Sequence, residues 1–258
     1  MAKIHPTAII DPSAELDSSV EVGAYTLIGA GVKIGAGTTV GPHCVIETGT
    51  TIGLDNRIWQ FCSIGAAPQD KKYAGEPTTL EIGDRNTIRQ FCTFNRGTAQ
   101  DVGVTRVGND NWIMAYVHLA HDCQIGNQTI FANNAQLAGH VHVNDWAILG
   151  GFTVVHQFVK LGAHSISGMG SILFKDLPPY VVCAGNPAQP HGVNTEGLKR
   201  RGFTAAQVEN VRRAYKTIYK SGHTLAAARA ELEKTAQEQS ELQLFLDFFA
   251  VADRGIMR

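Results

Sequence analysis

A six-residue repeat runs through most of the chain and constrains the fold more than any other feature of the sequence. Large apolar residues recur at every sixth position from Ile4 to Ile64, and the pattern returns at Ile82 and again between Val107 and Leu161. A period of six fits neither a helical stripe near 3.6 nor a continuous strand at 2. Short strands joined by tight turns around a triangular parallel β-helix do fit it, with about 18 residues in each coil. The sequence therefore predicts an all-β solenoid.

The interior of the predicted solenoid should be narrow, because the fourth residue after most repeat aliphatics is small. Four cysteines take this position, at Cys44, Cys62, Cys92 and Cys123. The five cysteines of the chain include no CxxC spacing, so a zinc ribbon or a disulfide framework is not expected. We interpret the thiols as small, free core residues. A content of 27 glycines and only 17% charged residues likewise favours an ordered, turn-rich β fold.

Two segments interrupt the repeat, at residues 66–79 and 97–106. Loops on a regular scaffold often carry binding residues, so both are candidates for function. We expect the β-helix to occupy residues 1–190, with these two insertions, and a C-terminal helical domain to occupy residues 191–258. Two pairs have the spacing of helix capping boxes, Thr204 with Gln207 and Ser240 with Gln243.

Charge and hydropathy exclude several classes of protein. The 22 Lys and Arg residues nearly balance the 23 Asp and Glu residues, which removes the global basic character typical of nucleic-acid binding. No apolar run approaches the ~18 residues of a membrane-spanning helix, and the first six residues lack the apolar core of a secretory signal. We therefore expect a cytoplasmic protein with no membrane span and no nucleic-acid partner.

Four of the ten histidines gather between positions 118 and 156, at His118, His121, His140 and His156. A coil of 18 residues places Gly139 one rung of ~4.8 Å from His121, with Gln157 one rung beyond. A single surface histidine is most often a solvated residue without a role. Here Asp122 can orient the imidazole of His121, and Gly139 offers an unshielded backbone N–H. The cluster therefore favours a general base beside an oxyanion hole.

Five further stretches make the sequence recognisable. They are Gln69-Asp70-Lys71-Lys72-Tyr73-Ala74-Gly75-Glu76-Pro77, His118-Leu119-Ala120-His121-Asp122, Leu137-Ala138-Gly139-His140-Val141, Val155-His156-Gln157-Phe158 and Asn194-Thr195-Glu196-Gly197-Leu198-Lys199-Arg200-Arg201-Gly202-Phe203. Over essentially its full length the chain resembles the UDP-N-acetylglucosamine O-acyltransferase family, which starts lipid A biosynthesis. Many enzymes share the hexads, whereas the first and last of these stretches are far more specific.

The resemblance implies a left-handed parallel β-helix that forms a homotrimer, with active sites in clefts between neighbouring solenoids. It implies transfer of a (3R)-3-hydroxyacyl chain from acyl carrier protein to the 3-hydroxyl of UDP-N-acetylglucosamine. No cofactor and no metal ion are expected. Thioester transfer to a hydroxyl needs a base and an oxyanion donor, and the histidine cluster can supply both.

The same resemblance implies roles for particular residues. His121 matches the general base, Asp122 the residue that orients it, and the Gly139 N–H the oxyanion donor. Six positions match those that contact substrate, namely Asp70, Lys72, His118, His140, His156 and Gln157. Four match those that hold the nucleotide end, namely Asn194, Glu196, Arg200 and Arg201.

Two positions bear on specificity. The family's usual Ile-His-Arg-Gly-Thr reads Phe94-Asn95-Arg96-Gly97-Thr98 here, so a titrating side chain is not expected at Asn95. Alignment of the Gly162-Ala163-His164 motif places the family's acyl-length stop at Met169. A methionine there should favour donors of about ten carbons over longer ones. The alternative is that Met169 only fills a gap where Ser167 breaks the aliphatic repeat.

Residues 196–222 carry seven basic and two acidic side chains, and this helical surface is a candidate for docking acidic acyl carrier protein. Three other hypotheses compete with the acyltransferase. A hydratase of the γ-carbonic-anhydrase type would bind zinc through His118, His121 and His140. A non-catalytic scaffold would leave the histidines without purpose. The related glucosamine N-acyltransferase normally carries an additional N-terminal domain, whereas the hexads begin here at Ile4.

Overall fold

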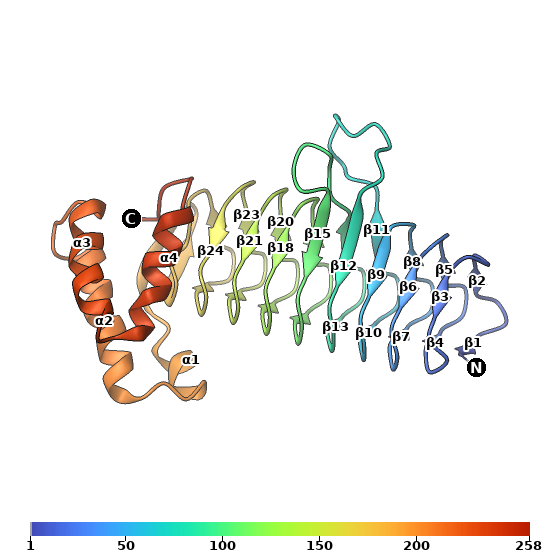
Figure 1. Cartoon of the computed structure of the whole chain (residues 1–258), viewed down its shortest axis with the longest axis horizontal. Coiled ribbons are helices and arrows are strands. Elements are labelled where there is room, and N and C mark those ends of the chain that lie inside the picture. Colours follow the sequence, from blue (N-terminus) through green and yellow to red (C-terminus); the bar gives the residue numbers. More distant parts are fainter. Residues whose placement is uncertain (1) are drawn as a thin grey trace.

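The computed structural model describes residues 2–258 and confirms a left-handed parallel β-helix with helices at its C-terminal end (Figure 1). Each coil contributes one short strand to each of three sheets, which we call faces 1, 2 and 3. Strands of successive coils pair in parallel with their repeat aliphatics in register, as Ile58 does with Val40 and Ile88. The repeat therefore decides which residues stack on one another.

The faces are built from the strands in chain order. Face 1 comprises β1 (Lys3–Ile4), β4 (Glu21–Val22), β7 (Thr39–Val40), β10 (Arg57–Ile58), β13 (Thr87–Ile88), β16 (Trp112–Ile113), β19 (Ile130–Phe131), β22 (Ile148–Leu149) and β25 (Ile166–Ser167), extended by β27 (Val181–Gly185) and β28 (Ala188–Val193). Face 2 comprises β2 (Ile9–Ile10), β5 (Leu27–Ile28), β8 (Val45–Ile46), β11 (Ser63–Ala66), β14 (Thr93–Asn95), β17 (His118–Leu119), β20 (Gln136–Leu137), β23 (Val154–Val155) and β26 (Ile172–Leu173). Face 3 comprises β3 (Glu15–Leu16), β6 (Lys33–Ile34), β9 (Thr50–Ile52), β12 (Thr79–Ile82), β15 (Val104–Val107), β18 (Gln124–Ile125), β21 (His142–Val143) and β24 (Lys160–Leu161).

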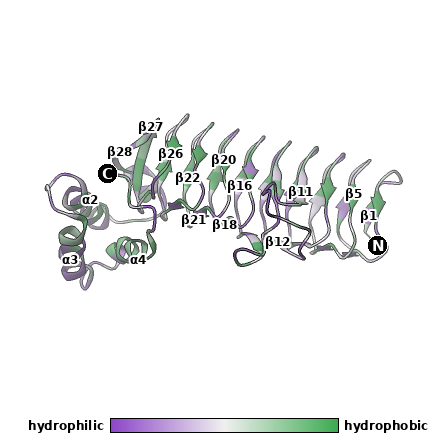
Figure 2. Cartoon of the chain, turned by 90° about the horizontal axis from the view of Figure 1, so that it is seen from above, coloured by the Kyte–Doolittle hydropathy of each residue, from purple (hydrophilic) through white to green (hydrophobic). Residues whose placement is uncertain are grey.

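The core fills the inside of the three faces, and hydrophobic colour recurs at the strands of successive coils (Figure 2). The interpretation of the cysteines is confirmed, because Cys44, Cys62, Cys92 and Cys123 are at most 2% exposed and all are free. Burial raises the pKa of Cys123 to about 12, so this thiol is no nucleophile. Each fully buried aliphatic side chain stabilises the coils by roughly 1.5–3 kcal/mol.

The turns between faces form three edges, which we call corners 1–2, 2–3 and 3–1 after the faces they join. The third residue of most turns has a left-handed backbone, for example Asp122 with φ 60° and His140 with φ 61°. Its N–H donates to the coil before, as His140 N does to His121 O at 3.0 Å. Side chains at one turn position therefore stack in columns along each corner.

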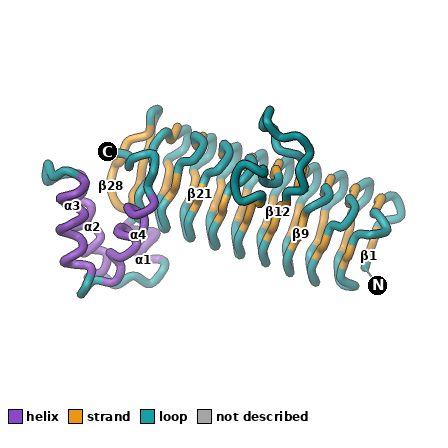
Figure 3. Tube along the Cα trace, turned by 45° about the horizontal axis from the view of Figure 1, so that its top comes forward, coloured by secondary structure: helices purple, strands orange, loops and turns teal. Residues whose placement is uncertain are grey.

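Two loops leave the coils in the middle of the solenoid and project together (Figure 3). One lies between β11 and β12, and the other lies between β14 and β15. The second is shorter than the predicted 97–106, because β15 begins at Val104. Its first residues pair with β12, Val104 with Thr79 and Thr105 with Leu80. Pairing with the neighbouring strand β12 thus extends β15 to residues that the six-residue repeat did not predict to be in a strand.

Strand β28 continues past residue 190, where the β-helix was expected to end. It is followed by five helical segments, namely α1 (Thr195–Arg200), α2 (Ala205–Tyr219), α3 (Leu225–Ala236), η1 (Ser240–Leu242) and α4 (Gln243–Val251). The Thr204 capping box is confirmed. The Ser240 box is wrong, because Ser240 begins a 3₁₀ turn and α4 starts at Gln243 without a side-chain cap. Tyr180 joins the last coil to this cap, since it packs in the helical core and its hydroxyl donates to Glu241 O at 2.7 Å. No helix in residues 2–258 is both long and apolar enough to span a membrane.

Candidate active site

His121 lies on corner 2–3, in the turn after β17. Its Nδ1 is 2.9 Å from Oδ2 of Asp122, and its side chain is only 14% exposed. A carboxylate can only accept, so this contact places the imidazole proton on Nδ1 and leaves Nε2 free to accept another. A short local pair of adjacent turn residues thus prepares His121 as a base.

Asp122 is completely buried and is held from several sides. The backbone N–H and the hydroxyl of Thr98 both donate to its carboxylate, the hydroxyl at 2.6 Å, and its own N–H donates to Thr105 Oγ1 at 2.7 Å. Burial acts to raise the pKa of Asp122, but hydrogen bonds from His121 and Thr98 together outweigh it and hold the pKa below its usual range. The carboxylate therefore stays charged and fixed.

Gly139 lies one coil further along the same corner, directly beneath the His121 ring. A Cβ atom at this position would be 2.5 Å from Cε1 and 2.6 Å from Nε2 of His121. Only glycine permits this approach. Among residues 2–258, no acceptor is hydrogen-bonded to the Gly139 N–H. Proline occupies the same turn position at Pro6, Pro12 and Pro42, so the coil itself does not need this donor.

His140 completes the cluster through contacts that the repeat did not predict. Its Nδ1 is 2.6 Å from Oδ2 of Asp101, and its ring lies edge-on to His121 with centroids 4.9 Å apart. Phe158 stacks on its other side at 4.3 Å. The 18-residue spacing of positions 122, 140 and 158 could have identified Phe158. Asp101 and Thr98 carry no such signal, because they lie in a loop that folds back over the coils.

The remaining residues predicted near the cluster are more loosely connected to it. His118 faces outward from β17, and its Nδ1 is 2.7 Å from Thr93 Oγ1. Burial lowers the pKa of His118. His156 contacts Gln157 O through Nδ1 at 3.2 Å, and its ring lies 5.9 Å from that of Phe174. The Gln157 side chain is exposed.

Asp70 and Lys72 lie together in the loop after β11. The Lys72 N–H donates to Asp70 Oδ1 at 2.9 Å, and the Lys72 side chain is exposed. Arg96 anchors this loop, since its guanidinium donates to Tyr73 Oη at 3.0 Å and to Gly65 O at 2.9 Å.

Asn95, at the unusual position of the motif, is 3% exposed. Its amide donates to Ala67 O at 2.9 Å, so the residue that replaces a histidine fixes the start of the loop.

The four residues predicted for the nucleotide end lie at the start of the helical cap, beside corner 3–1. Asn194 is buried and caps α1, accepting from Gly197 N at 3.0 Å. Glu196 pairs with Lys199 at 2.9 Å, and the exposed Arg200 follows. Arg201 Nη1 contacts His164 Nδ1 at 3.0 Å. Within residues 2–258, none of these four forms a hydrogen bond or an ion pair with the His121 cluster.

Met169 lies on the third edge, corner 1–2, in the turn between β25 and β26. Its side chain is 82% exposed, so the alternative that it fills an interior gap is wrong. The neighbouring Ser167 is buried instead, with its hydroxyl 2.9 Å from Thr153 Oγ1. Catalytic, nucleotide and acyl-length candidates thus occupy three different corners of one chain.

Residues 2–258 contain one compact group of side chains that could act as metal ligands. Atoms of His121, Asp122 and His140 that could serve as ligands lie within 4.8 Å of one another. His118, which the hydratase hypothesis required, is not in this group. The Asp122 carboxylate is also already occupied by Thr98 and His121. The donor set is therefore better suited to orienting a base than to a zinc site.

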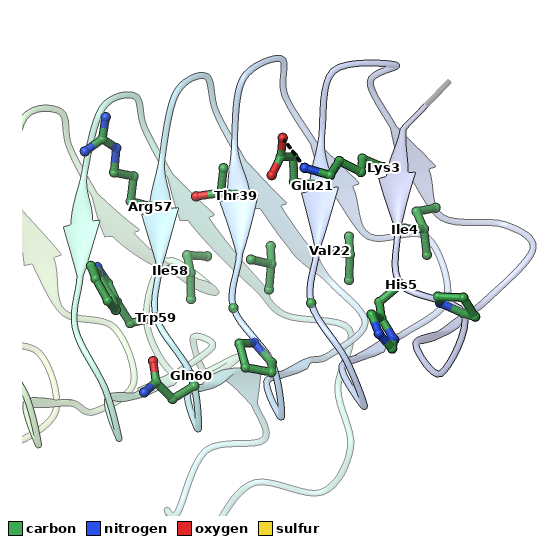
Figure 4. Close-up of a pocket in the computed structure, with 15 residues that line it drawn as sticks. Lys3, Ile4, His5, Glu21, Val22, Thr39, Arg57, Ile58, Trp59 and Gln60 are labelled. Carbon is green, nitrogen blue, oxygen red and sulfur yellow. Dashed lines mark hydrogen bonds and ion pairs between the residues drawn. The ribbon is translucent and has the colours of Figure 1, made fainter.

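A groove with a mainly apolar lining lies elsewhere, on the first coils of face 1 (Figure 4). It encloses ≈ 660 Å³ and is lined by the edges of Ile4, Val22, Val40 and Ile58, with Trp59 at one side. Its ion pair, Lys3 with Glu21 at 3.4 Å, is exposed and carries no catalytic geometry. The histidine cluster, by contrast, combines an oriented imidazole, a buried carboxylate and a backbone N–H that is free within residues 2–258.

Comparisons with known proteins agree on one family. A model described as "Udp N-acetylglucosamine O-acyltransferase; Domain 2" matches residues 176–257, and a bacterial transferase hexapeptide model matches residues 105–139. A protein of Janthinobacterium sp. (strain Marseille), named acyl-[acyl-carrier-protein]--UDP-N-acetylglucosamine O-acyltransferase, is 61% identical over 100% of both chains. One of the same name from Thiobacillus denitrificans is 64% identical over 79% of each.

Solved structures agree with these relatives. The UDP-N-acetylglucosamine acyltransferase of Francisella novicida superposes with a TM-score of 0.97 at 40% identity, covering 99% of this chain and 94% of that one. The UDP-N-acetylglucosamine O-acyltransferase of Moraxella catarrhalis also gives a TM-score of 0.97, at 45% identity over 99% of both chains. These proteins share the whole architecture, including the helical cap.

Proposed function

The chain belongs to the acyl-[acyl-carrier-protein]–UDP-N-acetylglucosamine O-acyltransferase family, and on that premise we propose that His121, Asp122 and Gly139 form its catalytic centre. The enzyme transfers a (3R)-3-hydroxyacyl chain from acyl carrier protein to the 3-hydroxyl of UDP-N-acetylglucosamine, the first step of lipid A biosynthesis. Membership of this family favours the O-acyltransferase reaction over the hydratase, scaffold and N-acyltransferase hypotheses. The main support for this site is the position of the His121 ring, which is hydrogen-bonded to buried Asp122 and lies over Gly139.

In the proposed reaction, His121 Nε2 takes the proton of the sugar 3-hydroxyl as its oxygen attacks the thioester carbonyl. A C–O bond forms, and the carbonyl oxygen becomes an oxyanion to which the Gly139 N–H can donate. The C–S bond then breaks, and the imidazolium returns the proton to the leaving thiolate. Asp122 stabilises the imidazolium while keeping the proton of Nδ1 in place.

The substrate-binding roles follow from the family and the chemistry of each group. Asp70, Lys72, His118, His140, His156 and Gln157 would contact the sugar and the acyl donor. Asn194, Glu196, Arg200 and Arg201 would hold the nucleotide end. Guanidinium groups suit its diphosphate, because they offer several donors in a fixed plane.

A homotrimer would bring these separate corners together. Faces 1 and 2 carry exposed apolar side chains, for example Trp112 on face 1 and Ile9 on face 2, the latter 67% exposed. Corner 1–2, between them, carries the stacked rings of Tyr25, His43, Phe61, Phe91 and Tyr116. Face 3 carries ion pairs between strands of successive coils, such as Lys33 with Glu15 and Arg106 with Glu81, whereas the Lys3–Glu21 pair of face 1 lies on its first two strands. Exposed apolar surface of this extent indicates association.

In a three-fold ring of such prisms, corner 1–2 points to the axis and face 2 of one chain meets face 1 of the next. Corner 2–3, with His121, then lies at the outer rim beside corner 3–1 of the neighbour, near its Arg201. The groove between the two faces runs inward to corner 1–2, where Met169 lies. This arrangement gives the acyl chain a path that ends at the proposed length stop.

The basic side chains of α1 and α2 form a candidate docking surface for acyl carrier protein. Arg200, Arg212, Arg213, Lys216 and Lys220 are all exposed. Acyl carrier proteins are acidic, so complementary charge would speed and orient their approach. We place the reaction in the cytoplasm, because five free, buried thiols suit a reducing compartment.

The direct test is to assay the purified protein with UDP-N-acetylglucosamine and a panel of acyl carrier protein thioesters. We expect an ester at the 3-hydroxyl, and an absence of transfer would contradict the function. A second test addresses the shared site. His121→Ala and Arg201→Ala chains, each poorly active alone, should regain activity when co-expressed, because mixed trimers contain some intact interfaces. No recovery would indicate that each site lies within one chain.

A further inference from the structure

Corner 3–1 carries a column of three aromatic rings in its last coils. Trp146 and His164 stack with centroids 6.2 Å apart and planes at 6°, and His164 and Tyr180 stack at 5.5 Å and 8°. All three have a left-handed backbone, with φ between 61° and 67°. His164 is 8% exposed and Tyr180 is completely buried, so the column is rigid and anchored in the core.

Arg201 from the end of α1 lies against this column. Its Nη1 is 3.0 Å from His164 Nδ1, and its guanidinium carbon is 4.9 Å from the centroid of the Trp146 ring. A guanidinium only donates, so Nδ1 must accept and His164 must carry its proton on Nε2. Burial, followed by the charge of Arg201, lowers the pKa of His164 to about 4. His164 is therefore neutral at physiological pH, as this contact requires.

The backbone of His164 also holds the other end of α1. Asn194 Nδ2 donates to His164 O at 2.8 Å while its Oδ1 accepts from Gly197 N and caps the helix. Arg201 closes the helix, since its own N–H donates to Leu198 O at 3.0 Å. A helix of 6 residues has little stability alone. His164 thus connects both ends of α1 to the rigid column.

The charge of Arg201 is left without an anion. Within residues 2–258 it forms no ion pair, and Nη1 is the only guanidinium nitrogen with a hydrogen-bond acceptor. Burial lowers its pKa, which reflects the cost of a cation that no carboxylate offsets. A ring face and a neutral imidazole orient the guanidinium without neutralising it, and its other donors remain available for a ligand.

We propose that Trp146 and His164 are positioning residues that hold Arg201 ready for the diphosphate of the sugar nucleotide. The inference rests on the proposed role of Arg201 in binding that group. Arg201 would otherwise sample many rotamers, and a fixed guanidinium loses less entropy when the anion binds. The two residues act only through Arg201, so they should affect binding of one substrate and leave the chemical step alone.

The test measures steady-state kinetics of the assembled enzyme for two variants. His164→Phe keeps a ring in the column but removes the acceptor, and Trp146→Leu removes the ring face. We expect each to raise the KM for UDP-N-acetylglucosamine about tenfold, with kcat and the KM for the acyl donor within about twofold of wild type. Trp146→Phe should restore most of the loss, because it returns a ring face to Arg201.

Trp59→Leu is the matched control, since Trp59 supports Arg89 at 4.3 Å in the same manner but on the first coils. It should leave the KM for UDP-N-acetylglucosamine unchanged, because Trp59 contacts neither Arg201 nor His164. Each variant is checked for its assembly state and for UDP binding by calorimetry, which does not depend on turnover. A general loss of packing would lower kcat or affect both substrates, and this result would overturn the positioning role.

Arg201→Ala is measured in parallel to separate the binding role of Arg201 from the positioning role of Trp146 and His164. If it raises the KM for the sugar nucleotide while His164→Phe and Trp146→Leu do not, the positioning role is wrong and the binding role stands. If Arg201→Ala changes nothing, the binding role is wrong and the positioning role is wrong with it. Calorimetric UDP binding gives the same comparison without turnover, so the two roles can be judged separately from acyl transfer, which the wild-type assay decides.

Discussion

Two corners of the same solenoid each carry a histidine with little exposed surface, but the charged groups that contact the two histidines are opposite in sign. On corner 2–3, His121 contacts the buried carboxylate of Asp122. On corner 3–1, His164 contacts the guanidinium of Arg201. The first partner stabilises a protonated ring, and the second excludes it. His121 is the second residue of its turn, whereas His164 is the third and has a left-handed backbone. Two different turn positions thus supply a proton acceptor at one corner and a fixed neutral support at the other.

The largest effect expected from this comparison is the loss of the base. His121→Ala should leave the fold and the assembly state unchanged and lower kcat by roughly 10²-fold or more, the usual scale for a positioned general base. His164→Phe, by contrast, should change KM and leave kcat within about twofold. Parallel kinetics of the two variants separate the corners, and a folded His121→Ala enzyme with near wild-type turnover would reject the mechanism.

Gly139→Ala should also strongly affect corner 2–3, lowering kcat by about 10²-fold. The added methyl group would overlap the His121 ring, which lies 2.5 Å from the Cβ position. It would displace the base and cover the free N–H together. Alanine is compatible with the turn itself, because Ala30 occupies the same turn position. Circular dichroism and sedimentation should therefore match wild type, and normal turnover would remove Gly139 from the catalytic centre.

The third prediction tests the charges at corner 3–1 through the pH dependence of the free energy of unfolding. The pKa of His164 falls from 6.5 to about 4 on folding, so the unfolded chain binds this proton more tightly. The resulting stability is complete above pH 6.5 and is lost progressively toward pH 4. Asp145 acts weakly in the opposite direction. Between pH 7 and pH 5 the loss should be about 2 kcal/mol of unfolding free energy.

His164→Phe isolates this contribution, because other histidines remain in both proteins. Urea unfolding at one fixed chain concentration should show a smaller decrease in stability for the variant than for wild type over this pH range. Equal decreases would indicate that His164 does not contribute and would remove the electrostatic contrast between the two corners.

The smallest expected effect concerns the remaining corner. If the acyl chain runs inward to corner 1–2, Met169→Gly should raise the rate with donors of about fourteen carbons relative to ten, by about tenfold. Each blocked methylene is worth ~1 kcal/mol at most. A competition assay with mixed donors measures the ratio. An unchanged product distribution would separate Met169 from the acyl groove, and the comparison would then involve two functional corners only.

The sequence alone determined everything that depends on the period of six. It predicted the solenoid, the inward cysteines and the register that brings Gly139 beneath His121. In a regular coil, a residue's neighbours are those one coil away, so counting along the chain is enough to identify them. The family resemblance then connected this geometry to acyl transfer.

Only the tertiary structure decided what lies outside that period. Asp101 and Thr98 reach the cluster because a loop folds back over the coils, and no spacing predicts where a loop returns. The capping box at Ser240 failed because packing of the cap imposed a 3₁₀ turn before α4. Arg201 and His164 are far apart in sequence and meet because the cap docks on the last coil. Burial and side-chain shape determine such long-range packing, and no local sequence pattern predicts it.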